Sequence, residues 1–117
     1  MDTFAFCAEP ALNQLLLNGV SLVGNQVVVG RIVSGDQFID DAELARKLHH
    51  EFNALACEME GAAIAHVCYV NQVPFTVVRS LSDMAGQGGD AARSFNDLKF
   101  MAAKRAAIVT KHLLERV

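Results

Sequence analysis

The feature that most constrains the fold is a strand–helix–strand pattern between residues 54 and 83. An apolar run at 54–57 precedes an alanine-rich segment with helical spacing at 61–70, and a second apolar, β-branched run follows at 73–78. Two strands joined through a helix are typical of a parallel sheet, in which ligands bind beyond the carboxyl ends of the strands. Three carboxylates stand where these strands end and predict one shared site: Glu58, Glu60 and Asp83.

The flanking segments extend this pattern in both directions. Pro10 opens a helix that Asn18 and Gly19 should close in a left-handed cap, and three consecutive valines mark a strand at 26–33. A helix starting with the acids at 40–43 follows this strand, and a long amphipathic helix closes the chain at 91–116. We therefore predict a single α/β domain over residues 1–117, with three layers and a mostly parallel sheet flanked by helices.

The apolar content indicates that this domain is part of something larger. Of the 117 residues 52% are hydrophobic and only 20% are charged, which favours a surface that expects a partner. A sheet of three strands is thin, and its two outer strands would be apolar edges. The sequence therefore looks like a piece of a larger sheet.

Charge and hydropathy argue against two classes of partner. The formal charge of −3 comes without a basic cluster, so nucleic acid is not expected as a partner. No apolar run approaches the ~20 residues that span a bilayer, and the amino terminus has no basic segment of the secretory type. We expect no membrane association and, by default, a cytoplasmic protein.

The cysteines and histidines do not form a reactive or metal-binding pattern. Cys57 and Cys68 lie in apolar segments and are expected to be small buried hydrophobes. His66 is two residues from Cys68 and cannot share its helix face as a catalytic base would. His49 and His50 are adjacent, so they point about 100° apart on a helix and cannot chelate one metal. Neither a metal nor a cofactor is expected.

Each of the three carboxylates has a structural and a functional interpretation. An acid near a helix start stabilises the helix dipole by ~0.3–1 kcal/mol, which explains Glu58 or Glu60 but not both, because residues two apart point in different directions. Asp83 follows a run that should be buried, with the hydroxyls of Ser80 and Ser82 nearby. It is either a partly buried general acid or the cap of a turn before a glycine-rich loop.

Three motifs, in order, carry a resemblance to a known family. They are IVSGDQFI at 32–39, EMEGAAIAHVC at 58–68 and VPFTVVRSLSD at 73–83. Together they resemble the 5′-methylthioadenosine/S-adenosylhomocysteine nucleosidases of the purine nucleoside phosphorylase superfamily, and the resemblance covers most of residues 27–117. It implies an N-glycosyl hydrolase whose small-molecule ligand is a purine nucleoside.

The resemblance also implies roles for residues of all three motifs. Phe38 would stack on the purine while the backbone of Ile39 reads the purine edge, and Asp83, helped by Ser82, would protonate the purine at N7. These roles suit the chemistry, since cleavage of a C–N glycosidic bond needs a protonated leaving base.

The ribose would be held by the second motif. By resemblance, Met59 packs against the sugar and Glu60 accepts hydrogen bonds from its hydroxyls. A carboxylate beside the sugar also stabilises the oxocarbenium-like transition state of the same reaction. Gly61 stands where many relatives have alanine, a departure that we expect to be harmless at a helix start.

Length is the larger departure from the family. The resemblance covers only the carboxyl-terminal half of the family members, and the glutamate that activates the attacking water belongs to the other half. We therefore expect a fragment or one piece of a split enzyme, inactive alone, that joins a complementary amino-terminal half or forms a homodimer. The alternatives are a fragment of a purine nucleoside phosphorylase, another hydrolase of modified nucleosides, or a non-catalytic purine-binding or dimerisation remnant.

Overall fold

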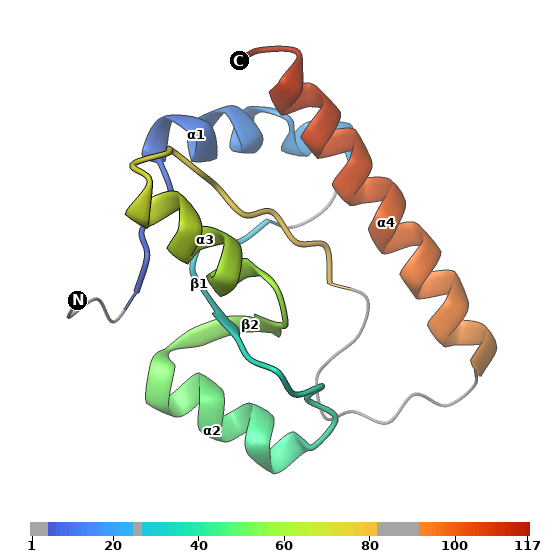
Figure 1. Ribbon diagram of the computed structural model, residues 1–117. Coiled ribbons are helices and arrows are strands. Elements are labelled where there is room, and N and C mark those ends of the chain that lie inside the picture. Colours follow the sequence, from blue (N-terminus) through green and yellow to red (C-terminus); the bar gives the residue numbers. More distant parts are fainter. Residues whose placement is uncertain (1–4, 25–26, 82–91) are drawn as a thin grey trace.

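The computed structural model describes residues 5–24, 27–81 and 92–117 (Figure 1). Helices surround a small sheet, which confirms the predicted α/β class with a parallel sheet and flanking helices. The elements are α1 (Pro10–Asn18), the 3-10 turn η1 (Val20–Leu22), β1 (Arg31–Ser34), α2 (Ala42–Phe52), β2 (Ala54–Glu58), α3 (Gly61–Val70) and α4 (Ala92–Leu114).

The sheet places the ends of its two strands side by side. β1 and β2 pair in parallel, with Ile32 opposite Ala56 and Ser34 opposite Glu58. α2 connects the two strands and contacts both of them, whereas α3 follows β2 and contacts β1. Ser34 and Glu58 are the last residues of their strands, so both lie at the carboxyl end of the sheet, beside the start of α3.

Two of the predicted strands differ from expectation. Residues 73–78 form no strand, although their composition favours one; the carbonyl of Phe75 instead accepts a hydrogen bond from the backbone N–H of Glu9 at 2.7 Å. The strand predicted at 26–33 begins only at Arg31. A strand exists only where a neighbouring strand supplies a hydrogen-bonding ladder, and composition alone cannot supply that neighbour.

The helix ends are partly as predicted. α1 begins at Pro10, but Gly19 after it is right-handed, with φ −90° and ψ −2°, so the predicted left-handed cap is wrong. Glycine has another reason to be there: a Cβ on Gly19 would lie 2.7 Å from the Cδ2 atom of His112, where α4 crosses α1. The left-handed cap occurs instead at Asn53, with φ 53°, after α2.

The other helices match their sequence signals closely. Asp41 caps α2 by accepting a hydrogen bond from the N–H of Glu43 at 3.0 Å. Near the other end of α2, Nδ1 of His49 pairs with the carbonyl of Ala54 at 2.7 Å, so this histidine joins α2 to β2. None of the helices in the described ranges is long and apolar enough to cross a membrane.

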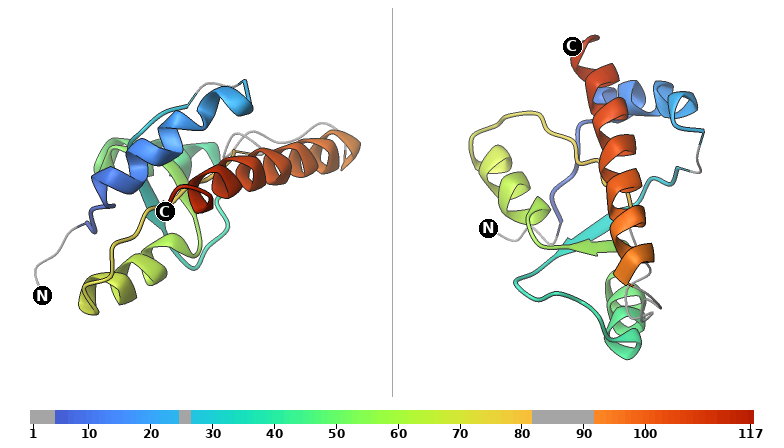
Figure 2. Two further views of the ribbon diagram at one scale, coloured as in Figure 1. Left: turned by 90° about the horizontal axis from the view of Figure 1, so that it is seen from above. Right: turned by 90° about the vertical axis from the view of Figure 1, so that its right-hand side faces the viewer.

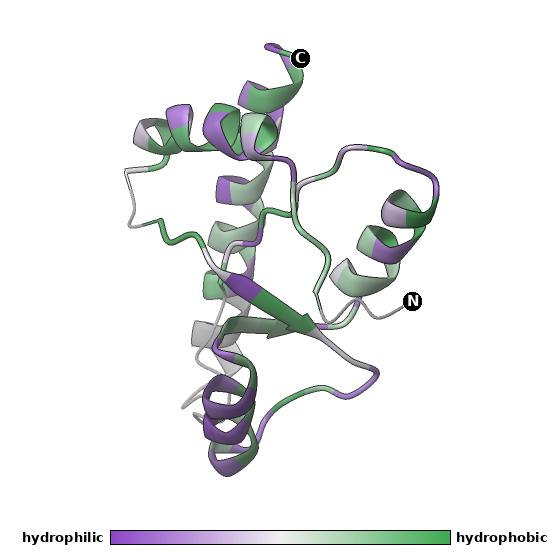
Figure 3. Cartoon of the chain, turned by 90° about the vertical axis from the view of Figure 1, so that its left-hand side faces the viewer, coloured by the Kyte–Doolittle hydropathy of each residue, from purple (hydrophilic) through white to green (hydrophobic). Residues whose placement is uncertain are grey.

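The packed interior is small. The buried hydrophobic residues each remain 5–8% exposed, and in the described part of the chain no side chain is fully buried. α1 and α4 contact each other at one end of the molecule and α2 lies at the other (Figure 2). α2 is largely hydrophilic while the strands are largely hydrophobic (Figure 3). The buried set is Leu16, Ala54, Ala65, Ala102 and Val109.

The cysteines are more exposed than expected. Cys57 and Cys68 are half-buried and Cys7 is exposed, and none of the three forms a disulfide with a described residue. His66 stacks on the ring of Phe6, with ring centroids 5.2 Å apart and planes at 16°. Within the described ranges no group of three or more potential metal-ligating side chains occurs.

Candidate active site

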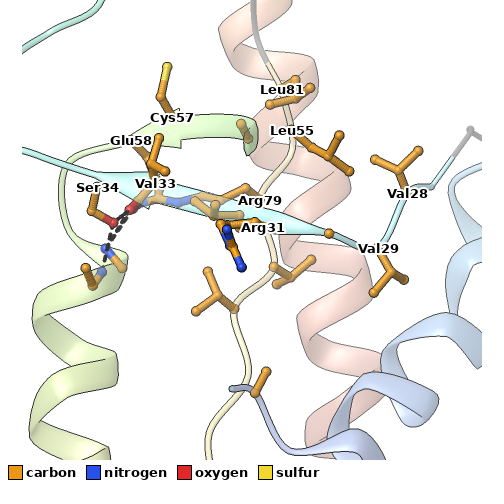
Figure 4. Close-up of a pocket in the computed structure, with 18 of the residues that line it drawn as sticks. Val28, Val29, Arg31, Val33, Ser34, Leu55, Cys57, Glu58, Arg79 and Leu81 are labelled. Atoms are coloured by element: carbon orange, nitrogen blue, oxygen red, sulfur yellow. Dashed lines mark hydrogen bonds and ion pairs between the residues drawn. The ribbon is translucent and has the colours of Figure 1, made fainter. Parts of the chain in front are cut away.

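The carboxylate of Glu58 is the centre of the site. Its side chain is only 9% exposed and lies beside Ser34, whose hydroxyl donates a hydrogen bond to Oε1 (Figure 4). The same hydroxyl oxygen accepts from the backbone N–H of Ala62 at 2.8 Å. Ser34 therefore links the ends of β1 and β2 to the first turn of α3.

Glu58 also caps α3. The backbone N–H of Gly61 lies 2.8 Å from each carboxylate oxygen, and the N–H of Glu60 donates to Oε2 at 3.1 Å. These are amides at the helix start that lack partners within the helix and carry the positive end of its dipole. Of the two glutamates, it is thus Glu58 that stabilises the helix start, while Glu60 makes no side-chain cap bond.

Arg79 connects the two glutamates. Its Nη2 atom donates to Glu58 Oε2 and to Glu60 Oε2, the latter at 2.8 Å. The side chain of Arg79 is 41% exposed and that of Glu60 is 66% exposed, so the ion-paired cluster runs from the interior to the surface. The predicted convergence of Glu58 and Glu60 is therefore achieved through the guanidinium.

The charges of this cluster stabilise one another. Burial by itself raises the pKa of Glu58, but hydrogen bonds from Ser34, from Arg79 and from the amides of Glu60 and Gly61 outweigh burial and lower that pKa below its usual value. The hydrogen bond to Glu58 likewise raises the pKa of Arg79. Both groups therefore stay ionised at neutral pH.

An open apolar hollow borders the cluster. Its volume is about 1070 Å³, just above the range of roughly 300–1,000 Å³ that is typical of small-molecule sites. Ser34, Ile39, Glu58 and Arg79 lie in its wall, together with side chains that are mostly hydrophobic. The space suits a ligand with an apolar body and a few polar groups.

Among the described residues that were predicted to bind substrate, Ile39 lines this hollow, whereas Phe38, Met59 and Glu60 do not. Ile39 is half-buried in its wall, whereas Phe38, at 65% exposed, and Met59, at 45% exposed, are open to solvent. The backbone N–H of Met59 donates to Glu60 Oε2 at 3.3 Å. Asp83 and Ser82 lie outside the described residues, so their predicted roles stay predictions.

Sequence reasoning gave no role to Arg79 or Ser34, and of Gly61 it predicted only that glycine in place of alanine is harmless. The sequence signal for Arg79 is its position directly after the apolar run at 73–78. The preceding motif contains the two carboxylates, Glu58 and Glu60. A Cβ on Gly61 would lie 2.8 Å from Glu58 Oε1, so glycine at this position leaves room for that carboxylate. An alanine would therefore require the hydrogen-bonded carboxylate of Glu58 to shift, which is a local reason for glycine at this position.

Comparison with known proteins places this geometry in context. The family model described as the phosphorylase superfamily matches residues 1–117. A curated relative, the 5′-methylthioadenosine/S-adenosylhomocysteine nucleosidase of Treponema pallidum (strain Nichols), is 44% identical over 93 residues, which are 80% of this chain and 35% of the relative.

Solved structures agree with that match. The nucleosidase of the same name from Campylobacter jejuni has a TM-score of 0.83 and 33% identity, over 96% of this chain and 48% of its own. The Colwellia psychrerythraea nucleosidase in complex with adenine has a TM-score of 0.82 and 34% identity, and the match covers 97% of this chain and 47% of its own. Futalosine hydrolase of Helicobacter pylori has a TM-score of 0.80 and 34% identity, and the match covers 94% of this chain and 46% of its own. This chain thus spans half or less of the length of each of these relatives.

Proposed function

Because the chain belongs to the phosphorylase superfamily, we propose that it supplies one half of a purine nucleosidase active site. The reaction is hydrolysis of the N-glycosidic bond of 5′-methylthioadenosine or S-adenosylhomocysteine, which releases adenine. The names of the Treponema and Campylobacter relatives support this substrate class, as does the adenine bound to the Colwellia relative.

The observation that carries the proposal is the state of Glu60. Its Oε2 atom is held by Arg79 at 2.8 Å, while its Oε1 atom makes no hydrogen bond with any described residue, and the side chain is 66% exposed. A carboxylate fixed through one oxygen and open at the other is suited to accept hydrogen bonds from a sugar diol. Arg79 is then a positioning residue, since it holds Glu60 in place and ties it to Glu58.

The remaining roles follow the order of the motifs. Phe38 offers an exposed ring on which a purine can stack, and the backbone of Ile39 reads the purine edge. Met59 packs against the ribose. Asp83, with Ser82, donates the proton to N7 of the departing adenine, and Glu60 stabilises the positive charge that develops on the sugar. The bond to the base breaks as water adds to the anomeric carbon, and the water gives its proton to a base that the unmatched half supplies.

Adenine release tests the proposal. The purified chain should release no adenine from 5′-methylthioadenosine, but it should do so once the half of the Campylobacter nucleosidase that it does not match is co-expressed with it. In that assembly Glu60→Gln and Asp83→Asn should each lower kcat/KM at least a hundredfold. The control Glu43→Gln, in the first turn of α2, should leave kcat/KM unchanged. Full activity of Asp83→Asn would remove Asp83 as the acid.

A phosphorylase is the second candidate, because the matching family model is named for that activity. Its reaction would use phosphate in place of water, so adenine release that requires added phosphate would favour it. Futalosine offered as a competing substrate separates the hydrolases, since one structural relative carries that name. Adenine binding without any cleavage in the completed assembly would favour a non-catalytic remnant.

A further inference from the structure

Glu58 and Glu60 share one guanidinium. Arg79 donates through its Nη2 atom to Oε2 of each carboxylate, so a single nitrogen serves two anions. Two carboxylates and one guanidinium leave these three groups with one negative charge in excess. The place of that excess charge decides what Glu60 can do, because a carboxylate neutralised by an arginine attracts a developing cation less strongly.

Glu58 is the stronger partner of Arg79. The side chain of Glu58 is 9% exposed and that of Glu60 is 66% exposed, and an ion pair withdrawn from water is screened less than an exposed one. The hydrogen bond to Glu58 is also the largest cause of the raised pKa of Arg79, and the contributions of Glu60 are smaller. The guanidinium charge is therefore neutralised mainly by Glu58.

The surroundings of Glu58 hold it fixed and ionised. Ser34 donates to its Oε1 atom, the N–H of Gly61 lies 2.8 Å from each oxygen, and the N–H of Glu60 donates to Oε2. Burial by itself raises the pKa of Glu58, but these donors and Arg79 together lower it. A carboxylate held in this way is a permanent anion that cannot turn toward a ligand.

We propose that Glu58 is the counter-ion of Arg79, which allows Arg79 to hold Glu60 in place without neutralising it. Glu60 then keeps a largely unshared negative charge for the sugar, on which positive charge develops as the bond to the base breaks. Glu58 is a positioning residue in this arrangement, because it acts through Arg79 and not on the substrate. The inference deepens the proposed function and rests on it for the reaction.

Glu58→Gln tests the electrostatic role in the assembly with the unmatched half of the Campylobacter nucleosidase. Arg79 should then pair with Glu60 alone, and kcat for 5′-methylthioadenosine should fall about tenfold or more. KM should change less than about threefold, because a carboxylate oxygen that accepts from Arg79 can still accept from a sugar hydroxyl. The control Glu51→Gln breaks an exposed ion pair with Lys47 in α2 and should change neither constant.

A double variant separates lost charge balance from structural damage. In Glu58→Gln/Arg79→Gln the guanidinium is removed as well, so Glu60 again carries an unshared charge. We expect kcat to recover about threefold or more over Glu58→Gln, while KM rises because Arg79 no longer holds Glu60. A purely structural role of Glu58 predicts the opposite, since a second lost contact would lower kcat further. Failure of kcat to recover would overturn the inference.

Ser34→Ala provides a second variant if Glu58→Gln does not fold. It removes a hydrogen bond that lowers the pKa of Glu58, so this carboxyl group is protonated at a higher pH than in the wild type. On the acid side of the pH profile, kcat should therefore begin to fall at a higher pH. Ser21→Ala, at an exposed serine of η1, should keep the wild-type profile, and an unchanged profile in Ser34→Ala would count against the counter-ion role.

Crystal structures of the chain alone test the charge arrangement without catalysis. In Glu58→Gln, or in Ser34→Ala at acid pH, Arg79 should donate to both oxygens of Glu60, where the wild-type contact is to Oε2. An Arg79 side chain that keeps its wild-type position would overturn the inference. If Arg79 turns to Glu60 but the wild-type assembly releases no adenine, the proposed function is contradicted and the counter-ion role stands.

Discussion

Replacement of Glu58 by glutamine tests whether this carboxylate organises the site. Glutamine keeps the shape and one acceptor oxygen but loses the charge and the second acceptor. Gly61 donates to both oxygens, Ser34 donates to Oε1, and Glu60 N–H and Arg79 donate to Oε2, so no orientation of an amide serves all four partners. We expect a less stable protein with a loosened start of α3.

The magnitude follows from two losses. Removal of a good helix cap costs about 0.5–2 kcal/mol. Loss of the ion pair with Arg79 costs about 0.2–1 kcal/mol, because that arginine is 41% exposed and solvent screens the interaction. Together they predict that Glu58→Gln lowers the free energy of unfolding by about 2 kcal/mol, a large part of the 5–15 kcal/mol typical of a domain.

Urea denaturation followed by circular dichroism measures this loss at pH 7. The matched control is Glu51→Gln, because Glu51 forms an exposed ion pair with Lys47 at 3.9 Å and should change stability by less than about 0.5 kcal/mol. Should Glu58→Gln not fold, Ser34→Ala removes one donor of the same network and should cost about 1 kcal/mol. Equal effects of the Glu58 and Glu51 substitutions would refute the reasoning.

The pH dependence gives the same experiment a second readout. The pKa of Glu58 is lowered in the folded protein, so the folded state favours the ionised form and gains stability above the ordinary glutamate pKa of about 4.3. That gain is lost as the pH falls through the folded pKa. The difference in unfolding free energy between wild type and Glu58→Gln should therefore have its largest value at pH 7 and decrease below about pH 4.

Two backbone predictions complete the set. Gln72 has φ 56°, where glycine is unstrained, so Gln72→Gly should stabilise the chain by about 0.5–1 kcal/mol in the same urea assay; a loss of stability would contradict this. Gly19→Ala should cost about 1–3 kcal/mol, because the new methyl group meets His112. Gly35→Ala is its control, since a Cβ there meets no atom within 4 Å, and equal costs at both glycines would count against the packing argument.

Local sequence signals determined where α1, α2 and α3 begin. Pro10 and Asp41 begin α1 and α2 as predicted, and α3 occupies the predicted range, Gly61–Val70. These features depend on a few neighbouring residues: a proline in a first turn, a carboxylate that reaches a free amide, a periodic apolar face. The three sequence motifs are likewise sufficient to indicate the superfamily.

Only the tertiary structure decided which apolar runs became strands and which charges met. Residues 73–78 have a strand composition without a strand, and Val27–Val29 remain outside β1, because a strand needs a paired neighbour and not only β-branched side chains. Arg79 joins Glu58 to Glu60 across about twenty residues of sequence, a contact without local signature. Such features depend on where distant segments lie, which one sequence does not state.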